Sequence, residues 1–254
     1  MCTLVLGLGI LGPGTLLLGA NRDESPDRPA SGPDVLVEKP RVVGGRDLVS
    51  WGTWLAVREA RFVTALMNRR PDPDDARDPA TLRSRGLLCL EVAAAPSTAS
   101  SFLDVAFDAV QRDRYGHCTL IGVGVDLEAW SLHAGWGEPT ASAIPQGWHV
   151  ITHRNLDDPE EPRTAWLLDR IRDLRPGSVH EAVDRLAGFL KMHGEGGSPA
   201  VCLHRNVFPT VSSSILALGD VPGGPCYFHA AGPPCVTPYV DHTKLLIGAM
   251  EAAS

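Results

Sequence analysis

The first twenty residues form one long apolar run that turn residues interrupt near its middle. Thr3–Ile10 and Thr15–Ala20 are both largely apolar, and Gly12-Pro13-Gly14 separates them. Glycine and proline in this arrangement are typical of a tight turn between two paired strands. The sequence therefore predicts an opening β-hairpin whose second strand delivers Asn21-Arg22-Asp23-Glu24 at its end.

The same apolar run also has to be compared with a signal peptide and with a membrane helix. No Lys or Arg precedes Arg22, so the positively charged start of a signal peptide is missing. The turn at residues 12–14 interrupts the run, and a membrane helix needs roughly 20 continuous apolar residues. We therefore expect no membrane span and a cytoplasmic protein.

The remaining chain alternates between groups of strands and groups of helices. Strands are predicted at residues 54–57, 62–67, 118–125, 128–133, 148–152, 214–218 and 226–230. Helices are predicted at residues 82–94, 102–110, 163–174 and 179–192. Hairpin-like strand pairs flank the helices, which differs from regular β-α-β alternation. The pattern predicts an α+β fold of antiparallel sheets covered by helices, in a single domain spanning residues 1–254.

Composition narrows the classes of partner. Hydrophobic residues make up 44% and charged residues 21%, so a core of normal size can be buried. The net charge of −7 and the lack of a basic stripe argue against nucleic acid. Six cysteines in 254 residues are too sparse for a disulfide scaffold, which favours free thiols in a reducing compartment. The oligomeric state stays open.

One motif suggests a nucleotide but lacks the context that it needs. Gly7–Gly12 matches the dinucleotide pattern G-x-G-x-x-G. That motif works only where a helix begins, because the helix N-terminus binds the pyrophosphate. Here Pro13-Gly14 continue as a turn and a strand follows, so the sequence argues against a nucleotide site.

Cys2 is the sharpest chemical feature of the chain. Removal of Met1 would leave an N-terminal cysteine with a thiol and a free α-amine, whose ordinary pKa is roughly 7.7–8.0. Such an amine can take the thiol proton near neutral pH, as in N-terminal nucleophile enzymes. A neighbouring cation such as Arg22 would lower the thiol pKa further. The alternative is that Cys2 is an ordinary strand residue.

Several sequence blocks resemble the NRDE family, also called the transport and Golgi organisation family. They are the segments at residues 1–6, 20–24, 45–48, 52–55, 62–68, 84–86, 152–157 and 212–218. This family resembles the cysteine N-terminal nucleophile (Ntn) hydrolases, in particular the choloylglycine hydrolase and penicillin V acylase branch. The resemblance implies a four-layer αββα sandwich of two antiparallel sheets, with Cys2 as nucleophile.

The resemblance also implies a set of site residues. Arg22 and Asp23 would steer the amine and thiol of Cys2, and Asn68 would donate to the oxyanion. Residues placed around the substrate would be Asn21, Trp54, His153 and Asn155. Tryptophans, among them Trp51, Trp54 and Trp136, are expected in the core or in pocket walls.

Two positions depart from the family pattern. His153 stands where the family has Asn, and Asn155 falls two residues late. Val211 stands where the family has Arg. Both departures affect the later half of an acylase-like site.

The sequence thus predicts a cysteine amidohydrolase or acyltransferase that acts on a small amide or acyl substrate through an acyl-enzyme on Cys2. We expect no cofactor and no metal, because structural zinc usually shows two compact ligand pairs and only one is present among Cys202, His204, Cys226, His229 and Cys235. The alternative is a carrier for haem or lipid, with a structural Cys2 and with His153 or His229 as ligand.

Overall fold

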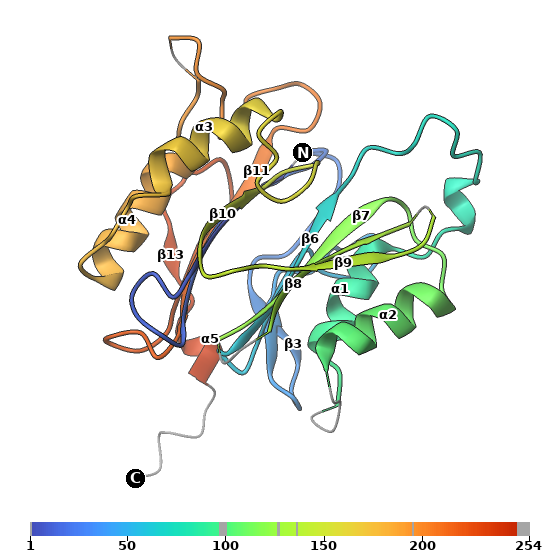
Figure 1. Ribbon diagram of the computed structural model, residues 1–254, viewed down its shortest axis with the longest axis horizontal. Helices are drawn as coiled ribbons and strands as arrows, with labels where there is room; N and C mark the ends of the chain where they lie inside the picture. The colour runs from blue at the N-terminus through green and yellow to red at the C-terminus, as the bar shows by residue number, and fades with distance from the viewer. Residues whose placement is uncertain (1, 97–100, 126–127, 136, 195, 248–254) are drawn as a thin grey trace. The chain divides into compact units, whose positions relative to one another are not determined.

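The computed structural model describes the chain apart from residues 1, 97–100, 126–127, 136, 195 and 248–254 (Figure 1). Met1, whose removal is expected, and Trp136, which is expected in the core or in a pocket wall, lie outside the described residues. The described residues form two compact units, one from Met1–Arg28 and Pro145–Lys244, the other from Pro29–Ile144 and the C-terminal stretch. Each unit is assembled from two separate stretches of chain, and the single domain stays a prediction.

The first unit contains a six-stranded antiparallel sheet with the strand order β10-β1-β2-β11-β12-β13. Its strands are β1 (Thr3–Leu8), β2 (Thr15–Asp23), β10 (Gly147–Ile151), β11 (Thr210–Gly219), β12 (Cys226–Ala230) and β13 (Val240–Asp241). The predicted hairpin is present, since β1 pairs with β2 across the short turn. Helices α3 (Pro162–Ile171) and α4 (Val179–Leu190) belong to the same unit.

Helices α3 and α4 pack on one face of this sheet (Figure 1). Val5, Leu17 and Ile215 of the sheet share a buried core with Leu167 of α3 and Leu186 of α4. Residues that point to the opposite face, such as those at positions 4, 6, 16 and 18, are buried as well. This explains the continuous apolar runs of β1 and β2, because a strand buried on both faces has no polar side.

The second unit contains a seven-stranded antiparallel sheet in the order β3-β4-β5-β6-β7-β8-β9. Its strands are β3 (Asp34–Val37), β4 (Val42–Gly44), β5 (Leu55–Arg58), β6 (Phe62–Asn68), β7 (Cys118–Gly124), β8 (Ala129–Ala134) and β9 (Thr140–Ala143). Helices α1 (Arg85–Ala93) and α2 (Phe102–Arg112) pack on it through Leu88, Val92 and Ala106, which contact Leu120 and Leu132. The short helix α5 (Lys244–Ile247) follows β13.

The α+β class and the two antiparallel sheets are confirmed, and several local predictions change. Strand β2 continues to Asp23 rather than ending at Ala20, because β11 supplies pairing partners for Arg22 and Asp23. Strands β3, β4, β9 and β13 were not predicted. Helix α1 begins at Arg85, after a 3-10 turn at Pro79–Thr81. No helix in the described ranges is long and apolar enough to cross a membrane.

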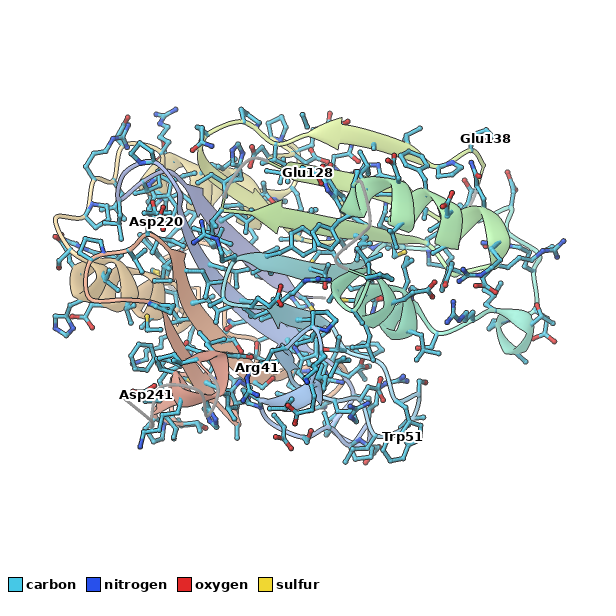
Figure 2. The ribbon with its side chains drawn as sticks, turned by 90° about the horizontal axis from the view of Figure 1, so that it is seen from below. Arg41, Trp51, Glu128, Glu138, Asp220 and Asp241 are labelled. Carbon is cyan, nitrogen blue, oxygen red and sulfur yellow. The ribbon has the colours of Figure 1, made fainter. Side chains whose placement is uncertain are left out.

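The tryptophans differ in their surroundings. The ring of Trp54 packs over Gly45, where a Cβ would come within 2.5 Å of the ring. Trp51 does not fit the predicted core or pocket position, since it is 61% exposed and lies at the surface of the second unit (Figure 2). Its φ of 60° and a 2.8 Å hydrogen bond from its backbone N–H to Asp47 O place it in a turn between β4 and β5.

Candidate active site

Cys2 lies at the end of the first sheet where β1 begins and where β2 and β10 end. The register pairs Thr3 with Asn21, which brings Cys2 level with the last residues of β2. The Cys2 sulfur accepts a hydrogen bond of 3.4 Å from the backbone N–H of Asp23. The regular hairpin therefore brings Cys2, Arg22 and Asp23 together.

The Asp23 carboxylate is enclosed by groups from β11 and α3. Its side chain is fully buried, and Thr210 donates a 2.6 Å hydrogen bond from Oγ1 to its Oδ1. The Arg163 guanidinium lies 3.6 Å from Oδ2. Burial nevertheless raises the pKa of Asp23, and the contacts with Thr210 and Arg163 offset only part of that rise.

Arg163 is a site residue that the sequence did not indicate. It stands in the first turn of α3, directly after Pro162, and it also donates a 2.7 Å hydrogen bond from Nη1 to Thr3 Oγ1. The only sequence signal was a helix predicted to start at this position. Nothing in its spacing connects it with Asp23, because the contact spans 140 residues of intervening chain.

Effects of opposite sign act on the pKa of the Cys2 thiol. Arg22 is buried, with its Nη2 4.0 Å from Glu24 Oε2, and its charge lowers the pKa of Cys2. Burial first, and then the Asp23 carboxylate, raise that pKa by more, so the net shift is upward. The predicted lowering by Arg22 is therefore outweighed. The thiol is protonated at neutral pH, and a base has to take its proton before it can attack.

Asn21 lies on the helix-covered face of β2. Its amide donates both hydrogens, to Leu190 O at 2.9 Å and to Val201 O at 3.0 Å. These bonds connect β2 to the end of α4 and to the loop that follows. Because both donors are used and the side chain is buried, Asn21 fits a structural role better than the predicted substrate contact.

His153 and Asn155 lie in the loop that follows β10. The register of β1 with β10 pairs Leu4 with Ile151, and its continuation brings His153 level with Cys2. His153 is half-buried and Asn155 is exposed. Asp157 ends this segment and accepts a 2.8 Å hydrogen bond from Val150 N, which holds the loop against β10.

Asn68 and Trp54 belong to the second unit and are described within it. Asn68 is the last residue of β6, pairs with Cys118 and is exposed. Trp54 is half-buried, immediately before β5, and its backbone oxygen accepts a hydrogen bond from Leu66 N. Because its side chain is exposed, the amide of Asn68 is accessible to a ligand.

One hollow of the first unit has the size of a ligand site but lies at the other end of β1. Its volume is about 760 Å³, and its walls include Ile10, Leu11, Val183 and Phe228. Drug-sized ligands usually occupy about 300–1,000 Å³. However, β1 separates this hollow from Cys2 by roughly 20 Å at the usual rise per strand residue. The hollow therefore does not serve Cys2.

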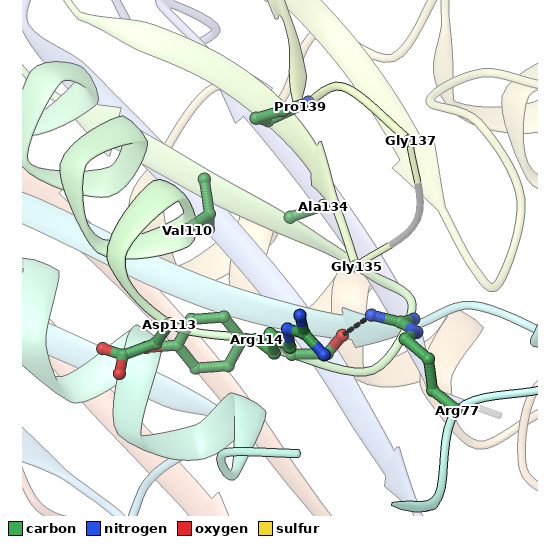
Figure 3. Close-up of a pocket in the computed structure, with 9 residues that line it drawn as sticks. Arg77, Val110, Asp113, Arg114, Ala134, Gly135, Gly137 and Pro139 are labelled. Atoms are coloured by element: carbon green, nitrogen blue, oxygen red, sulfur yellow. Dashed lines mark hydrogen bonds between the residues drawn. The ribbon is translucent and has the colours of Figure 1, made fainter. Parts of the chain in front are cut away.

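A hollow of the second unit is smaller and contains none of the predicted site residues. Its volume is about 150 Å³, and Arg77, Val110, Arg114 and Pro139 are among its walls (Figure 3). Arg77 is held there by a 3.2 Å hydrogen bond to the backbone oxygen of Tyr115, drawn as a dashed line (Figure 3). This volume is below the usual range for a small-molecule substrate.

Comparison with solved structures identifies the fold as that of the Ntn hydrolases. A Caenorhabditis elegans N-acylethanolamine-hydrolyzing acid amidase ortholog matches with a TM-score of 0.55 and 15% identity, covering 85% of this chain and 92% of that one. The C2A mutant of conjugated bile acid hydrolase from Clostridium perfringens matches at 0.50 and 12%, covering 98% and 94%. Penicillin V acylase from Agrobacterium tumefaciens matches at 0.50 and 13%, covering 98% and 88%.

The sequence comparison defines the family within that fold. The chain belongs to the Transport and Golgi organisation 2 family, whose model matches residues 1–190. This confirms the predicted NRDE resemblance. No curated protein matches the sequence. The matched segment contains every predicted site residue from Cys2 to Asn155, and it ends at the last residue of α4.

Proposed function

We propose that this protein is an amidohydrolase or acyltransferase that uses Cys2 as an N-terminal nucleophile. The observation that carries the proposal is the placement of the Cys2 sulfur against the backbone N–H of Asp23, beside Arg22. The fold is shared with enzymes named as an acid amidase, a conjugated bile acid hydrolase and a penicillin V acylase, which supports hydrolase or acyl-transfer chemistry in general terms. The substrate would be a small amide or acyl compound.

The first step would create the nucleophile. The raised pKa of Cys2 keeps the sulfur protonated, so the mechanism needs a base close to it. Removal of Met1 would expose the α-amine of Cys2, which can accept the thiol proton. The thiolate would then attack the carbonyl carbon, with Asn68 and a backbone N–H as the proposed oxyanion donors.

The second step would expel the leaving group. The α-ammonium returns its proton to the amide nitrogen, the C–N bond breaks and a thioester forms on Cys2. The amine then takes a proton from water, and the resulting hydroxide equivalent attacks the thioester. Release of the carboxylic acid regenerates the thiol. If an amine or alcohol acceptor replaces water, the same site transfers the acyl group.

The surrounding residues would orient these groups. Asp23 can accept a hydrogen bond from the α-amine and fix its direction, much as the third member of a catalytic triad orients the base. Arg163 would balance the buried charge of Asp23 from the opposite side. His153 and Asn155 are the proposed substrate contacts of the loop after β10, and Trp54 is proposed as a pocket wall.

We propose a cytoplasmic location on chemical grounds. None of the six cysteines forms a disulfide, although the sulfur atoms of Cys202 and Cys235 lie only 3.6 Å apart. Two thiols at this separation persist more readily in a reducing compartment than in an oxidising one.

The experiment that tests the function is an acyl-enzyme screen followed by intact-mass measurement. The purified chain is incubated with N-acylethanolamines, conjugated bile acids and penicillin V, and then with an electrophile that labels thiols. We expect the mature chain to lack Met1, one substrate class to add its acyl group at Cys2, and Cys2→Ala to abolish turnover. Cys2→Ser should retain a trace of activity at most.

Cys226→Ser is the matched control, because Cys226 is also half-buried and is remote from Cys2 along the sheet. This variant should keep full turnover. Retention of Met1 in active protein would contradict the free-amine mechanism. Unchanged turnover in Cys2→Ala would contradict the assignment of the nucleophile.

A carrier function remains the second candidate because of the 760 Å³ hollow, which has a largely apolar wall. Haem ligation by His229 receives no support, because this side chain is buried and its Nδ1 is 3.0 Å from Ser214 Oγ. Burial, and then the nearby His242, lower the pKa of His229 to about 4. A carrier would bind an apolar ligand with unchanged affinity in Cys2→Ala.

A further inference from the structure

Two histidines and two cysteines of the first unit converge on one point. They are His193, Cys202, His204 and Cys235, and their ligand atoms all lie within 4.8 Å of one another. The four residues come from different segments: the stretch after α4, the loop before β11 and the loop after β12. Such convergence of distant segments shows a tertiary cluster rather than a local sequence motif.

The distances within the cluster are short and similar. The sulfur atoms of Cys202 and Cys235 are 3.6 Å apart, and Nε2 of His193 and His204 are 3.3 Å apart. His204 Nε2 lies 3.8 Å from the Cys202 sulfur and 3.2 Å from the Cys235 sulfur. His204 therefore directs Nε2 at both thiols, and His193 directs its own Nε2 at that of His204.

These separations match the edges of a tetrahedron around a zinc ion. With Zn–S near 2.3 Å and Zn–N near 2.0–2.1 Å, tetrahedral geometry puts two sulfurs about 3.8 Å apart and two nitrogens about 3.3 Å apart. A sulfur and a nitrogen would be about 3.6 Å apart in the same geometry. Four of the six edges of the cluster differ from these values by about 0.4 Å at most. The other two edges, from His193 to the two sulfurs, lie within 4.8 Å, so the His193 ring would move toward the ion on binding.

We propose that His193, Cys202, His204 and Cys235 form a structural Zn²⁺ site. Two thiolates and two imidazoles are the donor set that zinc prefers in tetrahedral protein sites. Calcium and magnesium need oxygen ligands, and none of the four residues supplies one. Because the protein fills all four positions, the ion has no open coordination site, which makes it structural rather than catalytic.

A disulfide between Cys202 and Cys235 explains less of the geometry. It would need the sulfur atoms about 2.05 Å apart, and it would involve neither histidine. Here the sulfurs are 3.6 Å apart, and two imidazoles approach the same point although both histidines are exposed and could point into water. A shared cation accounts for both observations.

The ion would fix the loop between α4 and β11. At its start, Met192 O accepts hydrogen bonds from the backbone N–H groups of Val201 and Cys202, at 2.9 and 2.8 Å. At its end, Leu203 N donates a 2.9 Å hydrogen bond to Thr210 Oγ1, the group that donates to Asp23. The zinc would thus hold in place the backbone that supports Thr210.

This site is independent of the family relationship. All four ligands follow residue 190, where the match to the family ends. It shares Cys202, His204 and Cys235 with the group considered in the sequence, but His193 takes the place of Cys226 and His229. The proposed zinc site therefore departs from the sequence-based expectation of no metal.

The test measures metal in the full-length chain, purified without chelators under reducing conditions from zinc-supplemented medium. Elemental analysis should find about one zinc per chain. Cys202→Ser and Cys235→Ser should each lose it, whereas Cys226→Ser and His180→Ala should keep it. The two controls remove a half-buried cysteine and an exposed histidine that lie outside the cluster.

Cobalt substitution covers the case in which the ligand variants fail to fold. Unmutated protein freed of zinc and loaded with Co²⁺ should show the visible bands of a tetrahedral ion and a thiolate charge-transfer band. The proposal is overturned if the chain neither contains zinc nor takes up Co²⁺. It is equally overturned if folded Cys202→Ser retains stoichiometric zinc, or if intact mass shows a Cys202–Cys235 disulfide in protein purified under the same reducing conditions.

Discussion

The two units each contain a cluster of arginines and carboxylates, and the clusters differ in burial. In the first unit Arg163 lies 3.6 Å from Asp23, with side-chain exposures of 9% and 0%. In the second, Arg83 and Arg112 lie 2.7–2.8 Å from Glu91 and Asp113, with exposures between 26% and 56%. The tighter contacts are thus the ones that lie in water.

The consequences for the carboxyl groups have opposite sign. Burial raises the pKa of Asp23, whereas the hydrogen bond from Arg112 lowers the pKa of Asp113. Burial therefore disfavours the charged form of Asp23 despite its partners. The exposed Asp113 stays hydrated, and the neighbouring arginines favour its charged form. Distance alone does not rank the two clusters. A buried carboxyl group with an unfavourable charged form, such as Asp23, is typical of sites where chemistry takes place.

The largest expected effect is that of Arg163→Ala. This change leaves the Asp23 carboxylate buried without its guanidinium neighbour and also removes the hydrogen bond to Thr3. Breaking a buried pair from one side costs about 3–5 kcal/mol of unfolding free energy. Urea unfolding monitored by circular dichroism measures it. A loss below about 1 kcal/mol would mean that the pair of Arg163 and Asp23 stabilises the fold no more than an exposed ion pair does.

Thr210→Val is expected to have the next largest effect. Valine keeps the shape but removes the hydroxyl that donates to Asp23 and accepts from Leu203 N. Leaving these buried groups unsatisfied costs about 1–3 kcal/mol. Thr210→Ser preserves the hydroxyl and should recover most of the loss in the same unfolding assay. Equal losses in both variants would show that the methyl packing matters, not the hydrogen bonds.

The sequence reveals the hairpin end of the candidate site because that part is local. A glycine-proline turn and two apolar strands suffice to bring Arg22 and Asp23 back to Cys2. Arg163 and Thr210 could not be predicted, since they reach Asp23 through packing of distant elements. Of the Cys/His cluster, the sequence indicated Cys202, His204 and Cys235 as candidates but not His193, and it offered one compact pair where structural zinc usually shows two.

The strands that escaped prediction are short or have few apolar residues. Strand β4 has three residues, and β9 is the four-residue Thr140–Ala143, with exposed or half-buried side chains. A period-2 pattern cannot be recognised over so few positions. Their pairing is decided by the neighbouring strands β5 and β8, which the sequence did indicate. The extension of β2 to Asp23 likewise depends on β11.

The pH dependence of unfolding separates the two carboxylates by sign. A raised folded-state pKa means that native Asp23 holds its proton longer than the unfolded chain does, so its contribution to stability falls as pH rises above the ordinary 3.8. For Asp113 the lowered pKa gives the reverse, a contribution present above 3.8 and lost in acid. The unfolding free energy of each variant is subtracted from that of wild type at each pH. This difference should fall as pH rises above 3.8 for Asp23→Asn, and it should fall as pH drops below 3.8 for Asp113→Asn.

The smallest effect is expected for Arg112→Ala. Its guanidinium makes contacts of 2.7 and 2.8 Å with Glu91 and Asp113, both shorter than the 3.6 Å between Arg163 and Asp23. Its side chain is 56% exposed, so water and salt screen the attraction and the ordered side chain loses conformational freedom. We expect the smallest loss of unfolding free energy of the series in urea, and a still smaller loss in high salt. Arg112→Lys is the matched control, because it keeps the charge and removes the paired geometry. A loss as large as that of Arg163→Ala, persisting in high salt, would mean that close contact matters more than burial in this protein. The contrast between the two clusters would then fail.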